Sequence, residues 1–138
     1  MSLFVDSSVW YAAGDRGDRS NARAKRILKA AKDALVTTDH VLVETWLLFR
    51  HRLGRGVAEQ FWEGLRTGVA TIEAVTEGDL DLAWSIGAAY PDHDFSIVDR
   101  TSFSVMQRLG VHVVATSDTD FAVFRFGPGR RRAFTIAT

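Results

Sequence analysis

The sequence predicts one domain with a three-layer α/β fold and a mostly parallel central sheet. Short apolar runs alternate with segments of helical period, which is typical of β-α units around a parallel sheet. The 138 residues contain no internal repeat and no low-complexity linker that would divide them. Their 46% apolar and 25% charged residues are typical of a soluble globular domain. We therefore expect a single domain over residues 1–138.

The expected strands are short and mostly continuous apolar runs, as for strands that are buried on both faces. Only residues 69–75 alternate between apolar and polar side chains. The expected strands cover residues 3–5, 35–37, 69–75, 111–115 and 133–137.

Start and stop signals mark the helices between these strands. Thr76-Glu77-Gly78-Asp79 and Ser96-Ile97-Val98-Asp99 both match the capping box, in which an acid at the third helical position bonds back to the amide of the cap. One helix is expected from the first box to just before Pro91, and another from the second box to Leu109, closed by Gly110. The remaining helices are expected over residues 7–13, 19–33, 39–53 and 56–66.

Composition and charge exclude several classes of function. The chain has no Cys, which excludes disulfides, a thiolate nucleophile and a Cys-ligated metal. Its 17 basic and 17 acidic residues cancel, so any attraction to nucleic acid has to come from local patches. The longest uncharged run, 82–91, is far shorter than the ~20 residues that span a membrane. With no visible signal peptide, we expect a cytoplasmic protein without a membrane partner.

Basic residues do gather in one stretch of the sequence. Phosphate contacts from such a patch would supply salt-sensitive affinity for RNA, although most charge runs are simply solvated faces. The stretch between Asp15 and Asp33 contains Arg16, Arg19, Arg23, Lys25, Arg26, Lys29 and Lys32.

Two acidic residues come directly after expected strands. Asp6 follows the first strand, and Asp118 follows the 111–115 strand after two small polar residues. In parallel sheets the functional crevice lies beyond the carboxyl ends of the strands, where both carboxylates would then point. An Asp after a strand is also a common turn residue or helix cap, so each residue alone leaves both interpretations open.

Two further acids lie on expected helices. Glu44 shares a helix face with Val41 and Leu48, and a carboxylate on an apolar stripe is costly unless it is paired or metal-bound. A position at the boundary of the apolar face is the alternative. Asp99 occupies the capping-box position, yet it also shares a face with Phe103. A surface cap needs no such neighbour.

If these acids converge, they need a cation. Two carboxylates about 4 Å apart repel by about 4 kcal/mol at an effective dielectric constant of about 20. Their pKa values would rise unless positive charge compensates. Oxygen ligands without Cys or paired His favour Mg²⁺ or Mn²⁺, ions that activate water for attack on phosphodiesters. Convergence is the hypothesis on which the functional interpretation depends.

The sequence blocks around these acids resemble PIN-domain nucleases, and in particular the VapC-type toxins. The segment 4–10, Phe-Val-Asp-Ser-Ser-Val-Trp, is similar to the opening of that family. Residues 39–45 match the segment that carries the family's glutamate. Residues 94–106 resemble the most diagnostic block, and residues 115–121 resemble the block with the fourth acid. The order and spacing agree over nearly the whole chain, which implies a PIN-like α/β/α domain.

The resemblance implies a Mg²⁺- or Mn²⁺-dependent endoribonuclease, the toxin of a type II toxin–antitoxin pair. By match, Asp6 and Asp99 would be the principal metal ligands, and Glu44 and Asp118 would complete the acidic catalytic pocket. Ser8 and Thr116 would orient the carboxylates as hydrogen-bond donors. The implied partners are an RNA substrate, a cognate antitoxin and a second copy in a homodimer.

One position departs from the family pattern. The fourth block often has His two residues after its acid, and this chain has Asp120 there, either an extra acid or a helix cap. Asp94 is a further candidate outer acid, although a loop residue is the favoured interpretation.

Two other functional classes remain to be compared. One is a non-catalytic or weakly catalytic PIN-like module that binds RNA or protein, against which the intact set of acids argues. The other is an aspartyl-phosphate domain, which generally needs a Lys late in the chain. All three lysines lie before residue 33, which makes that class a poor match.

Overall fold

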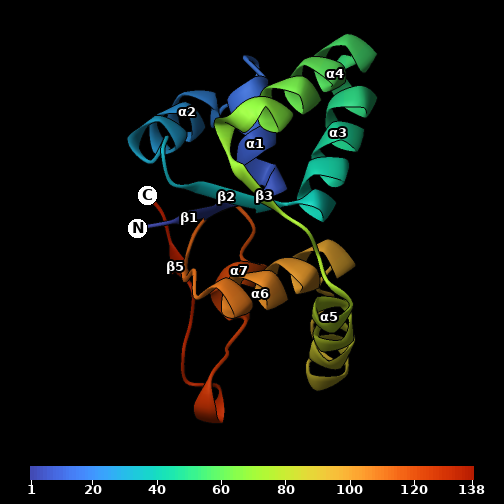
Figure 1. Cartoon of the computed structure of the whole chain (residues 1–138), viewed down its shortest axis with the longest axis vertical. Coiled ribbons are helices and arrows are strands. Elements are labelled where there is room, and N and C mark those ends of the chain that lie inside the picture. Colours follow the sequence, from blue (N-terminus) through green and yellow to red (C-terminus); the bar gives the residue numbers. More distant parts are fainter.

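The computed structural model describes all residues 1–138 and contains one five-stranded sheet (Figure 1). Every strand pairing is parallel, and the strand order is β3-β2-β1-β4-β5. The predicted α/β fold with its parallel sheet is therefore confirmed. The strands are β1 (Leu3–Val5), β2 (Leu35–Thr38), β3 (Thr71–Glu73), β4 (Val113–Ala115) and β5 (Thr135–Ile136).

Helices cover both faces of the sheet and make three layers. The helices α1 to α4 lie on one face and α5 to α7 on the other (Figure 1). The long helices are α1 (Ser7–Gly14), α2 (Asn21–Ala30), α3 (Asp39–Leu53), α4 (Arg55–Gly64), α5 (Glu77–Ala89) and α6 (Ile97–Leu109). The short elements are the π-helical turn η1 (Leu65–Val69), α7 (Asp120–Val123) and the 3₁₀ turn η2 (Pro128–Arg130). None of the helices combines the length and apolar character that crossing a bilayer requires.

The connections define one switch point in the sheet. From β1 the chain steps outward to β2 and β3, then crosses back through α5 and α6 to β4 on the other side of β1. The strand order thus reverses between β1 and β4. In open parallel sheets this is where the crevice at the carboxyl ends of the strands opens.

Several boundaries differ from the predicted ones. The strand predicted over 111–115 begins only at Val113, because the backbone of Val111 takes part in closing α6. Its N–H donates to the carbonyl of Met106 at 2.9 Å, and Gly110 adopts the left-handed conformation that closes the helix. The edge strands β3 and β5 are also shorter than predicted, and α2 covers only 21–30 of the predicted 19–33.

The two predicted capping boxes have different outcomes. Thr76 and Asp79 form both reciprocal hydrogen bonds, at 2.9 and 3.1 Å, so the first box is confirmed. In the second, Ser96 accepts from the Asp99 amide at 3.0 Å, but the carboxylate of Asp99 makes no return bond. That half of the prediction was wrong, because the side chain of Asp99 faces other acids instead.

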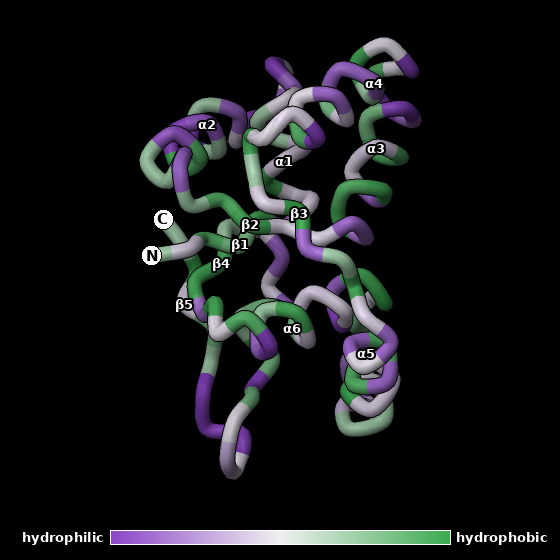
Figure 2. The backbone as a smooth tube through the Cα atoms, in the orientation of Figure 1, coloured by the Kyte–Doolittle hydropathy of each residue, from purple (hydrophilic) through white to green (hydrophobic).

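The core lies on both sides of the central strands. Phe4 and Val5 of β1 are completely buried, and the central strands are among the most hydrophobic segments of the tube in Figure 2. On the face of the sheet that α5 to α7 cover, the ring of Phe103 stacks on that of Phe124 with their centroids 4.4 Å apart. It meets the ring of Phe121 edge to face, with the centroids 4.9 Å apart. This packing seats α6 and α7 firmly against the sheet and so positions the acids that they carry.

Candidate acidic metal site

The four acids predicted to form the site come from four different elements. Asp6 immediately follows β1, Asp118 follows β4, Glu44 lies on α3, and Asp99 lies in the first turn of α6. Ser7 Oγ lies within hydrogen-bond distance of both Asp6 and Glu44, and Thr116 Oγ1 contacts both Asp6 and the amide of Asp118. Carboxylate oxygens of Asp99 and Asp118 lie within 4.8 Å of one another, and the charges of the other three acids raise the pKa of Asp99. The structure therefore brings them together at the switch point.

Asp6 is held by hydroxyl groups from α1 and from the loop after β4. Its amide donates to the carbonyl of Ala115 at 3.0 Å, which extends the pairing of β1 with β4 into the site. Its Oδ2 accepts from Thr116 Oγ1 at 2.8 Å and from Ser8 Oγ at 3.0 Å. The predicted contacts of Ser8 and Thr116 with a carboxylate are thus present. The side chain is only 2% exposed.

Glu44 is oriented by a residue that the sequence interpretation missed. Ser7 Oγ donates to Glu44 Oε1 at 2.5 Å and also lies 3.5 Å from Asp6 Oδ1. Ser7 thereby connects the acid after β1 to the acid on α3. The only sequence signal for this role is the position of Ser7 directly after Asp6. Spacing alone does not show which of the two adjacent serines, Ser7 or Ser8, contacts α3.

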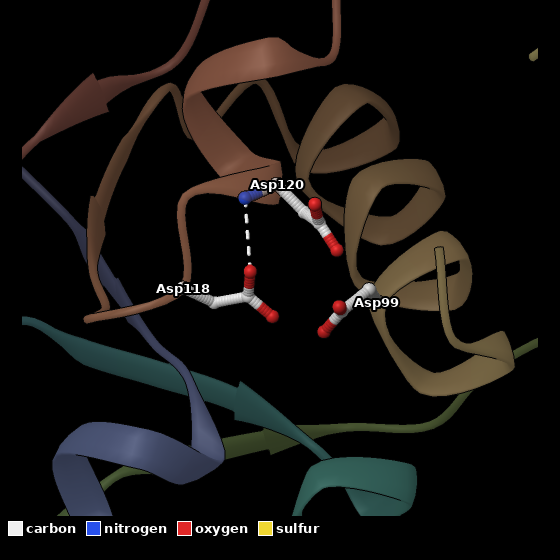
Figure 3. Close-up of side chains that lie close together, drawn as sticks. All are labelled: Asp99, Asp118 and Asp120. Atoms are coloured by element: carbon white, nitrogen blue, oxygen red, sulfur yellow. Dashed lines mark hydrogen bonds between the residues drawn. The ribbon is translucent and has the colours of Figure 1, made fainter. Parts of the chain in front are cut away.

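Asp99, Asp118 and Asp120 form the tightest cluster of acids (Figure 3). Each contributes one carboxylate oxygen to a set that lies within 4.8 Å of one another. The amide of Asp120 donates to Asp118 Oδ1 at 2.9 Å, which fixes the turn between them. Asp120 is the first residue of α7 but makes no capping bond with its side chain. Of its two interpretations, the geometry favours an extra acid.

Asp94 contributes to this site only from its edge. Its side chain is exposed and makes no hydrogen bond or ion pair. Its charge helps to raise the pKa of Asp120, after burial and the charge of Asp118. It is a loop residue near the pocket and not one of its converging ligands.

None of the four predicted acids forms an ion pair with a positive side chain, while the charge of His93 lowers the pKa of the neighbouring Asp120. The three ion pairs of the molecule involve Glu59, Glu73 and Asp79 and none of the site residues. Burial raises the pKa of Asp6 and of Glu44 above the usual range. Burial, followed by the charges of Asp6 and Asp118, raises the pKa of Asp99 to about 8. The site is therefore a concentration of negative charge that no ion pair offsets.

The donor set fits a divalent cation. It consists of hard carboxylate oxygens, which Mg²⁺ and Mn²⁺ prefer, and contains no sulfur or imidazole ligand. Burying carboxylates without partners is costly, and a bound cation is the natural compensation. The inner cluster can supply one oxygen from each of three acids, and the more deeply buried Asp6 lies behind it. These features define an acidic site, at the switch point of a parallel sheet, whose oxygen donors suit a divalent cation.

Comparison with known proteins agrees with this description. The model of the PIN domain family matches residues 3–127, and the chain belongs to that family. It is 34% identical over 124 residues to the 23S rRNA-specific endonuclease VapC20 of Mycobacterium tuberculosis, an alignment that covers 90% of this chain and 95% of VapC20. The predicted resemblance to PIN-domain, VapC-type proteins is thereby confirmed.

Solved structures show the same relationship. The crystal structure of M. tuberculosis VapC20, described as a sarcin-ricin loop cleaving toxin, superposes with a TM-score of 0.84 and covers 88% of this chain and 94% of that one. FitAcB from Neisseria gonorrhoeae superposes with a TM-score of 0.65 at 17% identity, covering 85% of this chain and 88% of that one. The second likeness shows a shared fold.

Proposed function

We propose that this protein is a Mg²⁺- or Mn²⁺-dependent endoribonuclease and the toxin of a type II toxin–antitoxin pair. The observation that carries the proposal is the set of buried and half-buried acids, none of them in an ion pair, at the switch point. The name of VapC20, an RNA endonuclease that shares 34% of its aligned residues, supports RNA as the substrate. The proposed place of action is the cytoplasm.

In this proposal Asp6 and Asp99 are the principal metal ligands, and Glu44 and Asp118 complete the pocket. Asp120 is close enough to take part. A divalent cation bound there supplies an activated water and neutralises charge at the scissile phosphate. The hydroxyl groups of Ser7, Ser8 and Thr116 hold the carboxylates in place. The expected products carry a 5′-phosphate and a 3′-hydroxyl, and no side-chain nucleophile is needed.

The proposed partners are an antitoxin and a second copy of the chain. A groove of about 460 Å³ runs along the exposed side of α3 next to the site, lined by Glu44 and by apolar side chains that include Val43, Leu47 and Val98. Leu47 is 55% exposed and Val43 48% exposed. An apolar surface of this kind favours association, and we assign it to the homodimer that the family resemblance implies.

The test is cleavage of RNA by the purified protein. A synthetic sarcin–ricin stem-loop and total ribosomal RNA are incubated with wild-type protein in Mg²⁺, Mn²⁺ or EDTA. We expect cleavage with either metal and none in EDTA. The variants Asp6→Asn and Asp99→Asn are expected to lose cleavage because each removes a proposed metal ligand. Asp81→Asn, an exposed acid on α5, is the matched control and should cleave normally.

Two results would contradict the proposal. Undiminished cleavage in EDTA and in both variants would remove the metal mechanism. Absence of cleavage, combined with equal RNA binding by wild-type and variant proteins, would favour the alternative of a non-catalytic RNA- or protein-binding PIN-like module.

A further inference from the structure

A polar cleft of about 370 Å³ opens directly beside the acidic site. It lies between α1, the start of α2 and the loop that follows β4. Its lining includes Ser8, Thr116 and Ser117 on one side and Arg19 and Arg23 on the other. Both arginines belong to the basic stretch of the sequence, for which phosphate contact and a solvated face were both left open.

The cleft and the acidic site share a wall. Ser8 and Thr116 line the cleft, and the same two hydroxyl groups donate to Asp6 Oδ2. The Ser117 amide donates to Ser8 Oγ at 3.0 Å, and this bond holds the wall between the cleft and the acidic site in place. One layer of side chains therefore separates the cleft from the proposed position of the cleaved phosphate.

The arginines of the cleft are available to a ligand. Arg19 and Arg23 are exposed, and neither makes an ion pair or a side-chain hydrogen bond within the protein. The one acid in the lining, Asp18, accepts the Ser20 amide at 2.8 Å through Oδ1 and so caps its own loop. The cleft thus carries two unpaired positive charges against one negative charge.

The backbone that presents these arginines is firmly held. Asn21 Nδ2 donates to the carbonyls of Ala12 and Ala13, at 2.8 and 3.2 Å, and ties the start of α2 to the end of α1. Asp15 Oδ1 accepts the Gly17 amide at 2.9 Å in the preceding loop. Only the arginine side chains have to become ordered when a ligand binds, which lowers the entropic cost of binding.

We propose that Arg19 and Arg23 bind a backbone phosphate of the RNA strand that neighbours the cleaved one, and so position the strand over the acids. This inference rests on the proposed ribonuclease function. RNA is favoured over an acidic protein because a strand whose phosphate lies at the acids places its next phosphates beside the shared wall. Guanidinium groups match phosphate geometry in a bidentate manner.

The test compares wild type with Arg19→Gln, Arg23→Gln and the double variant. The matched control is Arg66→Gln. Arg66 is exposed, lies outside the cleft and the acidic site, and makes no ion pair. Binding of a short labelled single-stranded RNA is measured by fluorescence anisotropy in EDTA over a range of salt concentrations. Cleavage of the stem-loop RNA in Mg²⁺ then gives kcat and KM.

For the double variant we expect Kd and KM to rise about tenfold, and the slope of log K against log salt to become shallower by about 0.7, because one phosphate contact is lost. Each single variant should have an intermediate effect. We expect kcat to stay at the wild-type value, because the arginines position RNA and do not touch the reacting atoms. The control should match wild type in all of these quantities.

Unchanged Kd, KM and salt slope in the double variant would overturn the inference, and this is the result expected if the arginines serve an acidic protein instead. The binding measurement in EDTA needs no catalysis. If wild type fails to cleave RNA while the double variant binds RNA more weakly, the ribonuclease proposal fails and the phosphate contact stands.

Discussion

The protonation of Asp99 is strongly perturbed in the acidic site. Burial, and then the charges of Asp6 and Asp118, raise its pKa to about 8. In an unfolded chain the pKa of Asp is about 3.9. Between these values the native state binds more protons than the unfolded state. The contribution of Asp99 to the free energy of unfolding of the metal-free protein therefore falls as pH rises from about 4 to about 8.

The variant Asp99→Asn tests this residue in the absence of metal. At pH 7 the folded state has to keep this carboxyl group largely protonated, whereas the unfolded chain ionises it freely. Asn removes that difference, so we expect a gain of about 1–3 kcal/mol in the free energy of unfolding at pH 7. The pH dependence between 4 and 8 should also flatten. Urea unfolding in EDTA at several pH values measures both. Asp81→Asn is the control, and equal pH profiles for wild type and Asp99→Asn would contradict the prediction.

The same variant should respond differently to metal. In the proposed function Mg²⁺ binds only the folded site, so it should stabilise wild-type protein by RT ln(1 + c/Kd), where c is the concentration of free Mg²⁺. Asp99→Asn loses a proposed ligand and should show a much smaller rise in Tm with added Mg²⁺. A rise equal to that of wild type would remove Asp99 from the ligand set.

At the scale of elements, one buried carboxylate ties β3, α5 and α6 together. Asp79, 3% exposed, lies in the first turn of α5 and accepts from Ser104 Oγ of α6 at 3.0 Å. Arg108, at the end of α6, lies 2.9 Å from Asp79 and 3.0 Å from Glu73 of β3. These bonds hold α6, and with it Asp99, in place. Although burial opposes ionisation, they lower the pKa of Asp79 to about 2.

We expect Asp79→Asn to lower the free energy of unfolding at pH 7 by about 2 kcal/mol. Removing one partner of a fully buried ion pair costs about 3–5 kcal/mol, but Arg108 is 35% exposed, which reduces the loss. Because the folded-state pKa is lowered, the contribution is present above about pH 4 and disappears as pH falls toward 2. Urea unfolding at pH 7 and pH 2.5 should show a smaller difference between wild type and variant at the lower pH.

At the scale of the whole molecule, the apolar groove on α3 bears on the proposed homodimer. Leu47 is 55% exposed, so a charge there is tolerated in the monomer but not in a buried interface. We expect Leu47→Glu to shift the protein to a folded monomer in light scattering coupled to size exclusion. Leu80→Glu, on the exposed side of α5, is the control. A dimer that persists in Leu47→Glu would exclude this face.

Much of the architecture was predictable because it depends on patterns that are local in the sequence. Short apolar runs between helical stretches indicate a parallel sheet, and Asp6 and Asp118 at strand ends indicate the edge where a site forms. The less accurate boundaries were those of short segments. Val111, for example, lies in an apolar run that is typical of a strand. Its N–H group, however, donates to the carbonyl of Met106 and so closes α6.

The sequence alone determined which acids stand at the ends of strands and on the apolar faces of helices, since both follow from the periods of strand and helix. Only the tertiary structure decided which oxygens meet. The capping-box pattern directs Asp99 back to its own helix, whereas packing turns it toward Asp118 and Asp120. The bond from Ser7 to Glu44 joins residues 37 apart. Such contacts depend on how helices seat against the sheet, which no local pattern specifies.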